Sequence, residues 1–121
     1  VIPLPGSTSL MLALMGSGFN GQSFVFHGYL PIDKNERIKK IKVMEQEART
    51  KNQTQIFMEA PYRNNQLLDA LLNTCSPQTR ICVASNISSV QQFVKTKTIS
   101  EWKSNKPELH KRPTIFIMGV V

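Results

Sequence analysis

The sequence predicts an α/β domain, close to α+β, with a mixed sheet of about five strands flanked by about four helices. Three observations support this fold class. The length of 121 residues is that of one domain, and a hydrophobic share of 40% is enough for a core. Short apolar runs alternate with segments of helical periodicity in the order α-β-α-β-α-β-β-α-β. No internal repeat or low-complexity linker divides the chain.

The first part of the chain predicts a buried helix and then a strand. No Asp, Glu, Lys or Arg occurs in residues 1–30. A hydroxyl residue within 7–9 can cap a helix over residues 10–15, which is apolar on nearly every side and is therefore expected to be buried. A strand over residues 23–30 follows, and Pro31 ends it because proline lacks the N–H that a ladder needs.

A capped amphipathic helix is predicted after this strand. Asp33 can accept hydrogen bonds at the helix N-terminus, and Glu36, three residues on, completes a capping box. Helical spacing places the basic residues outward and an apolar stripe inward, formed by Ile38, Ile41, Val43 or Met44, and Ala48. Residues 49–53 are expected to form the turn that ends the helix.

The stretch over residues 54–63 is expected to organise the site. Residues 56–58 form a short apolar run, typical of a strand covered on both faces. Pro61 stops the ladder and suits the first turn of a helix, which closes near residues 73–77. The buried face of this helix is marked by Leu67, Leu68, Leu71 and Leu72. Because α/β proteins bind ligands where a strand ends and a helix opens, the polar residues of this corner are candidates: Glu59, Tyr62 and Arg63.

Glu59 and Arg63 also have a purely structural interpretation. They are four residues apart, so they can form a local ion pair across the helix start. An acid near a helix N-terminus is also favoured by the helix dipole. The residues alone leave both interpretations open.

The second half of the chain predicts three more strands and a short helix. Strands are expected over residues 80–84 and 93–98, the second with Val94 inward and its lysines outward. Residues 85–92 form a loop or a hairpin. A short helix over residues 99–103 can be capped by Thr98 or Ser100, and a charged surface loop, 104–112, follows it. The last apolar run, 113–119, is expected to be a central strand.

The chain is basic, with a net charge of +7 and a pI of about 9.7. Residues 33–51 carry seven bases against four acids, and residues 95–112 carry six against two. This pattern permits a nucleic-acid partner, but it is equally that of a solvated helix face.

Several classes of protein are disfavoured by the sequence. No apolar run approaches the roughly 18 residues of a membrane span, and the apolar start lacks the basic region of a signal peptide. His27 and His110 are isolated, and no metal-ligand spacing occurs. The sequence allows a disulfide between Cys75 and Cys82, but it favours two reduced thiols of a cytosolic protein. The start at Val1 rather than Met suggests a part of a longer protein.

Three motifs in succession resemble those of one family. They are Pro5–Leu10, Phe24–Pro31 and Ile56–Arg63. In this order and spacing they resemble the tetrapyrrole methylase superfamily of S-adenosylmethionine-dependent methyltransferases. The resemblance is to the branch that contains the ribosomal RNA small-subunit (cytidine-2'-O)-methyltransferase I, and it covers essentially all 121 residues.

The resemblance implies a domain organisation. In this superfamily, the class III methyltransferases, two α/β domains enclose the cofactor, and residues 1–121 resemble the C-terminal one. The chain alone is then expected to bind S-adenosylmethionine poorly and to be inactive. The full-length protein is expected to be cytoplasmic and homodimeric, with no membrane association.

The resemblance also implies roles for individual residues. Positions that line the cofactor site in relatives are here Met58, Glu59, Ser85, Asn86, Ile87, Pro113 and Thr114. Positions on the substrate side are here Ser7, Thr8 and Tyr62. No catalytic residue is fixed by the motifs, and the candidates are Glu59 and Arg63.

Departures from the family pattern leave the methyl acceptor open. Relatives that methylate ribosomal RNA usually carry an Arg-Glu pair where this chain has Ser85 and Asn86, and Ala60 and Tyr62 replace the usual Ser and His. Three functions are therefore considered: a ribose 2'-O methyltransferase acting on RNA or a diverged paralogue, a methyltransferase of a tetrapyrrole or another small molecule, and a non-catalytic module for RNA binding or dimerisation.

Overall fold

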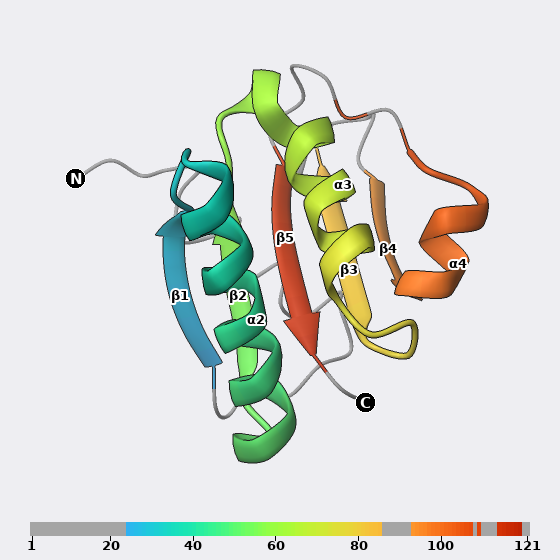
Figure 1. The fold of residues 1–121 in the computed structure, drawn as a ribbon. Coiled ribbons are helices and arrows are strands. Elements are labelled where there is room, and N and C mark those ends of the chain that lie inside the picture. Colours follow the sequence, from blue (N-terminus) through green and yellow to red (C-terminus); the bar gives the residue numbers. More distant parts are fainter. Residues whose placement is uncertain (1–23, 86–92, 108, 110–113, 120–121) are drawn as a thin grey trace.

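The computed structural model describes residues 24–85, 93–107, 109 and 114–119 (Figure 1). Their elements are β1 (Phe24–Tyr29), α2 (Lys34–Lys51), β2 (Thr54–Met58), the 3₁₀ turn η1 (Pro61–Arg63), α3 (Asn64–Thr74), β3 (Arg80–Ser85), β4 (Phe93–Thr98), α4 (Ile99–Ser104) and β5 (Thr114–Gly119). The predicted helix over residues 10–15 and the predicted loop from residue 86 to 92 lie outside the described residues. Ser85, expected to open that loop, instead ends β3.

The five described strands form one mixed sheet in the order β1-β2-β5-β3-β4. β1 and β2 are parallel, and every other neighbouring pair is antiparallel. The last strand along the chain, β5, therefore lies at the centre of the sheet, and all six of its residues are buried. The predicted mixed sheet with a central final strand is confirmed.

Helices α2 and α3 lie side by side against one face of the sheet, and α4 lies beside β4 at its edge (Figure 1). The core beneath them contains Phe57 of β2 and Phe116 of β5, whose rings are stacked with centroids 5.9 Å apart. Trp102 of α4 joins the same core and donates its indole N–H to the carbonyl of Ile81, 2.9 Å away. One apolar cluster thus connects all three described helices to the sheet.

The opposite face of the sheet is also buried. Its apolar cluster consists of Ile56, Cys82, Ala84, Ile115 and Ile117. Because both faces of β2, β3 and β5 are covered, these strands read as continuous apolar runs rather than as alternating ones. The prediction that residues 56–58 belong to a doubly covered strand is confirmed.

Helix α2 begins after the predicted N-cap Asp33 and ends later than predicted. The Asp33 carboxylate accepts a hydrogen bond of 3.0 Å from the Glu36 N–H. The predicted turn over residues 49–53 is wrong, because the helix continues to Lys51 and is closed by Asn52 in the left-handed region at φ 50°. Basic residues in the last turn, such as Arg49, favour this extension because they complement the helix dipole.

The buried stripe of α2 differs from the prediction at Ile38 and Arg37. Of the two predicted alternatives, Met44 faces the core and Val43 does not, while Ile38 is only half-buried. Arg37 was expected to face outward with the other bases, but only 8% of its surface is exposed. The buried stripe is Arg37, Ile41, Met44 and Ala48, which are spaced by four, three and four residues. Arg37 extends this stripe by one turn, and a long methylene stem can be buried in such a place.

The helix after β2 opens with a tighter turn than predicted. Residues 61–63 form η1, closed by a 2.8 Å hydrogen bond from the Arg63 N–H to the Ala60 carbonyl. The α-helix proper starts at Asn64, and its four predicted leucines are all buried. At its far end, Glu45 of α2 accepts hydrogen bonds from the Ser76 N–H and the Thr79 hydroxyl. These bonds fix the loop that leads into β3.

Helix α4 begins after one of its two predicted caps. Thr98, rather than Ser100, caps α4, in a reciprocal capping box with Glu101. Cys75 and Cys82 are both free and buried. Within the described ranges, no helix is long and apolar enough to cross a membrane. No cluster of His, Cys, Asp and Glu among the described side chains is suited to hold a metal ion.

Candidate functional site

The sheet register gathers several predicted site residues at one end of the strands. β2 and β3 both end there, and β5 starts there between them (Figure 1). Met58 pairs with Ile115, and Ser85 pairs with Thr114. Four predicted cofactor-binding residues therefore lie at the same end of neighbouring strands: Met58, Glu59, Ser85 and Thr114. The others, Asn86, Ile87 and Pro113, lie outside the described residues, as do Ser7 and Thr8.

Glu59 is the buried acid of this corner, with 2% of its surface exposed. Its Oε1 accepts a 2.8 Å hydrogen bond from the Ala60 N–H and lies 3.3 Å from Nε of Arg63. The local ion pair considered from the sequence is therefore present. The second carboxylate oxygen, Oε2, is buried and has no hydrogen-bond partner among the described residues.

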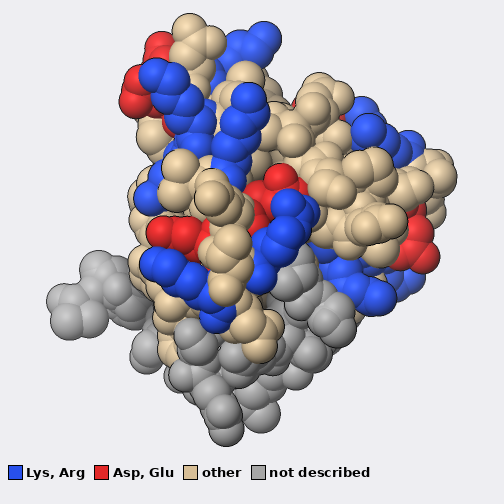
Figure 2. Space-filling model, turned by 60° about the horizontal axis from the view of Figure 1, so that its bottom comes forward, with Lys and Arg blue, Asp and Glu red and all other residues tan. Residues whose placement is uncertain are grey.

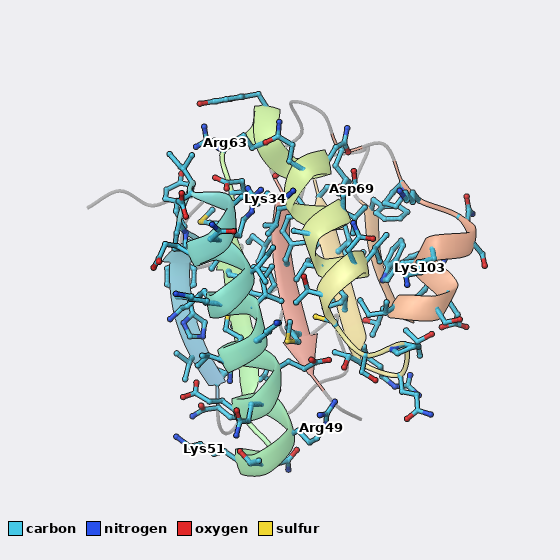
Figure 3. All side chains as sticks on the ribbon, viewed as in Figure 1. Lys34, Arg49, Lys51, Arg63, Asp69 and Lys103 are labelled. Carbon is cyan, nitrogen blue, oxygen red and sulfur yellow. The ribbon has the colours of Figure 1, made fainter. Side chains whose placement is uncertain are left out.

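Arg63 connects the buried acid to the surface. Its guanidinium lies 4.7 Å from the ring centroid of Tyr62, and Nη1 donates a 2.5 Å hydrogen bond to the Tyr62 hydroxyl. Tyr62 itself is 59% exposed. Figure 3 shows Arg63 and Lys34 at the same end of the molecule. The corner thus has a buried negative group, a half-buried positive group and an exposed ring in succession.

Asn64 is a site residue that sequence reasoning missed. It is fully buried at the first position of α3. Its Nδ2 donates hydrogen bonds to the Leu109 carbonyl at 3.1 Å and to the Thr114 hydroxyl at 3.2 Å. The next residue, Asn65, accepts a 3.1 Å bond from the Leu109 N–H. The sequence shows two successive amides at the start of a leucine-rich helix, but this pattern does not identify their distant partners.

Ser85 closes the corner on the β3 side. It is fully buried, and its Oγ has no hydrogen-bond partner among the described residues. A buried polar atom without a partner costs free energy, so such atoms are usually satisfied by a ligand, by water or by neighbouring side chains. The corner therefore has two polar atoms, Glu59 Oε2 and Ser85 Oγ, available for further hydrogen bonds.

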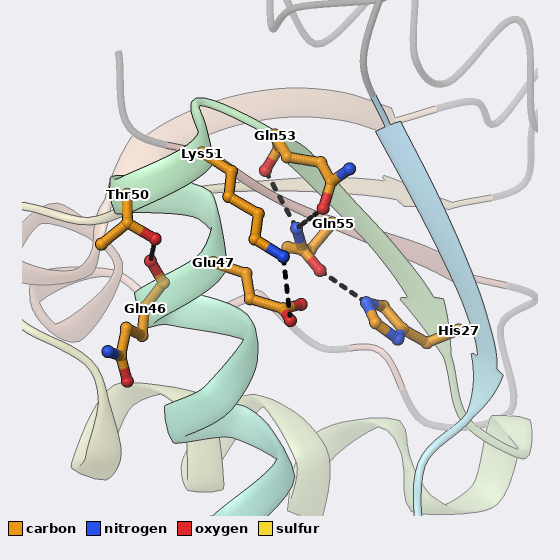
Figure 4. A network of polar contacts seen from close by, with 7 residues as sticks. All are labelled: His27, Gln46, Glu47, Thr50, Lys51, Gln53 and Gln55. Atoms are coloured by element: carbon orange, nitrogen blue, oxygen red, sulfur yellow. Dashed lines mark hydrogen bonds and ion pairs between the residues drawn. The ribbon is translucent and has the colours of Figure 1, made fainter.

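A separate polar network lies at the other end of α2 (Figure 4). His27 Nε2 is 2.5 Å from Oε1 of Gln55, and Nε2 of Gln55 donates a 3.0 Å bond to the Gln53 carbonyl. Lys51 pairs with Glu47 at 3.9 Å beside them. Gln55 is completely buried, so this network satisfies a polar side chain in the core. His27 is therefore structural, as its isolation in the sequence indicated.

A surface pocket lies between α3 and residues 106–107. It has a volume of about 270 Å³ and is lined by Asn65, Leu68, Asp69, Lys106 and Pro107. An ion pair of 3.0 Å between Asp69 and Lys106 occupies its rim. None of the residues predicted for the site contributes to this pocket.

Curated relatives of the chain share one name. The chain is 29% identical over 101 residues to the ribosomal RNA small subunit methyltransferase I of Pseudomonas aeruginosa, covering 84% of this chain and 34% of that protein. The protein of the same name from Bacillus subtilis is 31% identical over 101 residues, with 84% and 33% covered. The one from Buchnera aphidicola subsp. Schizaphis graminum is 26% identical over 121 residues, with 98% and 41% covered. No family model matches the chain.

The chain is a relative of these methyltransferases. The resemblance to the ribosomal RNA small-subunit methyltransferase I branch, stated above from three motifs, is thereby confirmed. The chain spans about a third of the length of its relatives from Pseudomonas and Bacillus, with 34% and 33% covered. Among solved structures, the methyltransferase CobJ has a TM-score of 0.56 and 18% identity, over 92% of this chain and 47% of that one. This likeness concerns the fold, and it confirms the predicted fold class.

Proposed function

We propose that the chain forms one wall of the cofactor site in an S-adenosylmethionine-dependent methyltransferase whose acceptor is an RNA ribose 2'-hydroxyl. The observation that carries the proposal is the similarity to proteins named ribosomal RNA small subunit methyltransferase I over 84% or more of the chain. The polar corner at the end of β2 supports it, because Glu59, Ser85 and Thr114 lie at the same end of neighbouring strands, where the resemblance places the cofactor.

The chemistry of the corner fits such a cofactor. Glu59 Oε2 is a buried acceptor without a partner in the described part of the chain, and Ser85 Oγ can donate or accept. S-adenosylmethionine carries ribose hydroxyls and amino groups that can donate to a carboxylate. Met58, Thr114 and the neighbours Asn86, Ile87 and Pro113 would line the remainder of this wall.

In this proposal, the residues of the corner hold the cofactor in place and do not act as general acids or bases. Bound S-adenosylmethionine supplies an electrophilic methyl group on a sulfonium, and its transfer requires alignment with the acceptor oxygen. A hydroxyl acceptor must also lose a proton to a general base. The Glu59 carboxylate is held by Arg63 and by the Ala60 N–H, so we assign it to cofactor binding. The base would then come from another part of the enzyme.

The proposal concerns the whole protein that carries these residues. Because the relatives from Pseudomonas and Bacillus are covered only to 34% and 33%, we propose that a second domain completes the cofactor cleft. A homodimer and a cytoplasmic location belong to the same proposal and follow from the resemblance. The exposed ring of Tyr62 would face the substrate side.

The test is methyl transfer from methyl-labelled S-adenosylmethionine by the full-length protein. Small-subunit ribosomal RNA and tetrapyrrole precursors are offered separately, and cofactor binding is followed by calorimetry. Label in the RNA is the expected result. Label only in a tetrapyrrole would overturn the RNA acceptor and keep the enzyme class. RNA binding without label in either acceptor and without cofactor binding would instead identify a non-catalytic module.

The site assignment has its own test in the full-length protein. Glu59→Gln removes the charge but keeps the shape of the side chain, and Asn86→Ala shortens a residue that the resemblance assigns to the cofactor site. Each is expected to weaken S-adenosylmethionine binding about tenfold, which corresponds to the loss of one hydrogen bond to a charged group. Asp69→Asn, in the pocket that contains none of the predicted site residues, is the matched control. Unchanged affinity for S-adenosylmethionine in both variants would refute the assignment of Glu59 and Asn86 to the cofactor site.

A further inference from the structure

Edge strand β1 carries an exposed row of aromatic side chains. Phe24, Phe26 and Tyr29 have exposed fractions of 43%, 42% and 63%, and these three residues are called the aromatic strip below. In the parallel ladder they pair with Thr54, Ile56 and Met58. Alternate residues of a strand share a face, and Ile56 belongs to the apolar cluster opposite the helices. The aromatic strip therefore continues that face to the edge of the sheet.

A bulge keeps the three rings on one side. Without it, Tyr29 would point away from Phe24 and Phe26, because it is an odd number of residues from both. The register shifts between Phe26 and Gly28, so one extra residue is accommodated there. Gly28 has φ +72°, a conformation that L side chains rarely adopt. The backbone is thus shaped so that the third aromatic ring joins the other two.

The aromatic strip leads to the candidate cofactor site. β1 and β2 are parallel, so their carboxyl ends lie side by side at the same end of the sheet. Tyr29 pairs with Met58, the residue before Glu59. A chain of stacked groups along the aromatic strip would therefore reach the corner where the proposed methyl transfer takes place.

We propose that the aromatic strip is a stacking platform for unpaired bases of the RNA substrate. This inference rests on the proposed function. Side chains on one face of a strand are spaced by about 7 Å, and sheet-face aromatics of this kind stack two or three bases in known RNA-binding domains. The net charge of +7 on this chain is complementary to a polyanion. In the view of Figure 2, Lys and Arg cover more of the described surface than Asp and Glu do.

The experiment compares RNA binding by the full-length protein and by the triple variant Phe24→Leu, Phe26→Leu, Tyr29→Leu. Leucine keeps an apolar surface and removes the π-face, so stacking is lost while apolar protein contacts are largely kept. The probe is a fluorescein-labelled, single-stranded RNA of mixed sequence, followed by anisotropy over a range of salt. Val43→Ala, at another exposed apolar side chain, is the control. Thermal melting verifies that each variant is folded.

The triple variant is expected to bind the RNA at least about tenfold more weakly, with an unchanged salt dependence because no charge is altered. Wild-type affinity in the folded triple variant would overturn the inference. If the triple variant binds RNA with full affinity and still methylates it, the stacking role of the strip is refuted and the proposed enzyme activity is kept. If RNA binding depends on the strip but the wild type transfers no methyl group, the proposed enzyme activity is refuted and the stacking role is kept.

Discussion

Asn64 connects three segments that are distant in the sequence. Its amide bonds to Leu109 and to Thr114 join the start of α3 to the approach and the first residue of β5. Because the residue is completely buried, each of these bonds replaces hydration that the folded chain no longer has. The geometry of the candidate site therefore depends on this side chain as much as on the residues that would touch a ligand.

Replacing Asn64 with alanine is expected to lower the free energy of unfolding by about 2–3 kcal/mol, because buried partners lose their hydrogen bonds. Asn73→Ala, at an exposed position of the same helix, is the matched control and should change stability by less than about 0.5 kcal/mol. Urea unfolding followed by circular dichroism measures both. Equal losses in the two variants would contradict the structural role of Asn64.

Cys75 links stability to alkaline pH. Burial, with a further contribution from the charge of Glu45, raises the pKa of its thiol to about 12. The unfolded chain releases this proton near pH 8.5 and the folded chain retains it, so stability falls as pH rises from about 8.5 toward 12.

The expected fall due to Cys75 is up to about 1.4 kcal/mol per pH unit. Cys75→Ala removes this contribution, so its stability should decline less steeply than that of the wild type between pH 8 and 11. Urea titrations at each pH give the two slopes. Parallel slopes would show that the thiol does not keep its proton in the folded chain.

The ends of the elements are determined by individual residues. Thr98 and Glu101 bond reciprocally at the start of α4, with the Thr98 N–H 2.9 Å from a Glu101 carboxylate oxygen. These bonds keep the pKa of Glu101 below its usual value. Thr98→Ala is expected to cost about 1 kcal/mol in thermal unfolding, and Ser100→Ala, the alternative cap in the sequence, a few tenths at most. A larger loss of stability in Ser100→Ala than in Thr98→Ala would identify Ser100 as the cap.

The bulge in β1 makes a prediction for the strand that carries it. Gly28 lies at φ +72°, where an L side chain is strained, although a Cβ there would meet no atom closer than 4.0 Å. Gly28→Ala is therefore expected to destabilise the protein by about 1–2 kcal/mol through backbone strain alone. Hydrogen exchange of the β1 and β2 amides should increase. An unchanged melting temperature would show that the bulge can rearrange freely.

The sequence was most informative where one local property determines the element. The continuous apolar runs of β2 and β5 predicted strands buried on both faces, and Asp33 predicted the start of α2. It was least informative where tertiary contacts decide. The burial of Arg37 depends on what packs against the first turn of α2, and the extra residue in β1 depends on its pairing with β2.

The candidate site shows the same division. Glu59 and Arg63 could be predicted because both follow a buried strand within one motif. Asn64 could not, since its partners Leu109 and Thr114 lie 45 and 50 residues away in the chain. The antiparallel register that pairs Ser85 with Thr114 is likewise a property of the assembled sheet.

At the scale of the whole molecule, the fold depends on a strand that comes last. β5 pairs with β2 on one side and with β3 on the other, so without it the described sheet would separate into two pairs of strands. Its Phe116 stacks on Phe57 and belongs to the same core as α2, α3 and α4. Long-range pairing of this kind makes folding cooperative and comparatively slow.

Phe116→Ala is accordingly expected to lower the free energy of unfolding by about 3–5 kcal/mol, the cost of a large cavity in a close-packed core. A domain of this size is stable by only about 5–15 kcal/mol, so this variant should melt far below the wild type. The matched control is Phe93→Ala on edge strand β4, where the ring is only half-buried and packs against Trp102 at the rim of the core. Its cost should be clearly smaller, because a partly exposed site can be filled by water. Calorimetric melting of the two variants compares them directly, and equal losses would mean that β5 does not have the central role that the sheet order gives it.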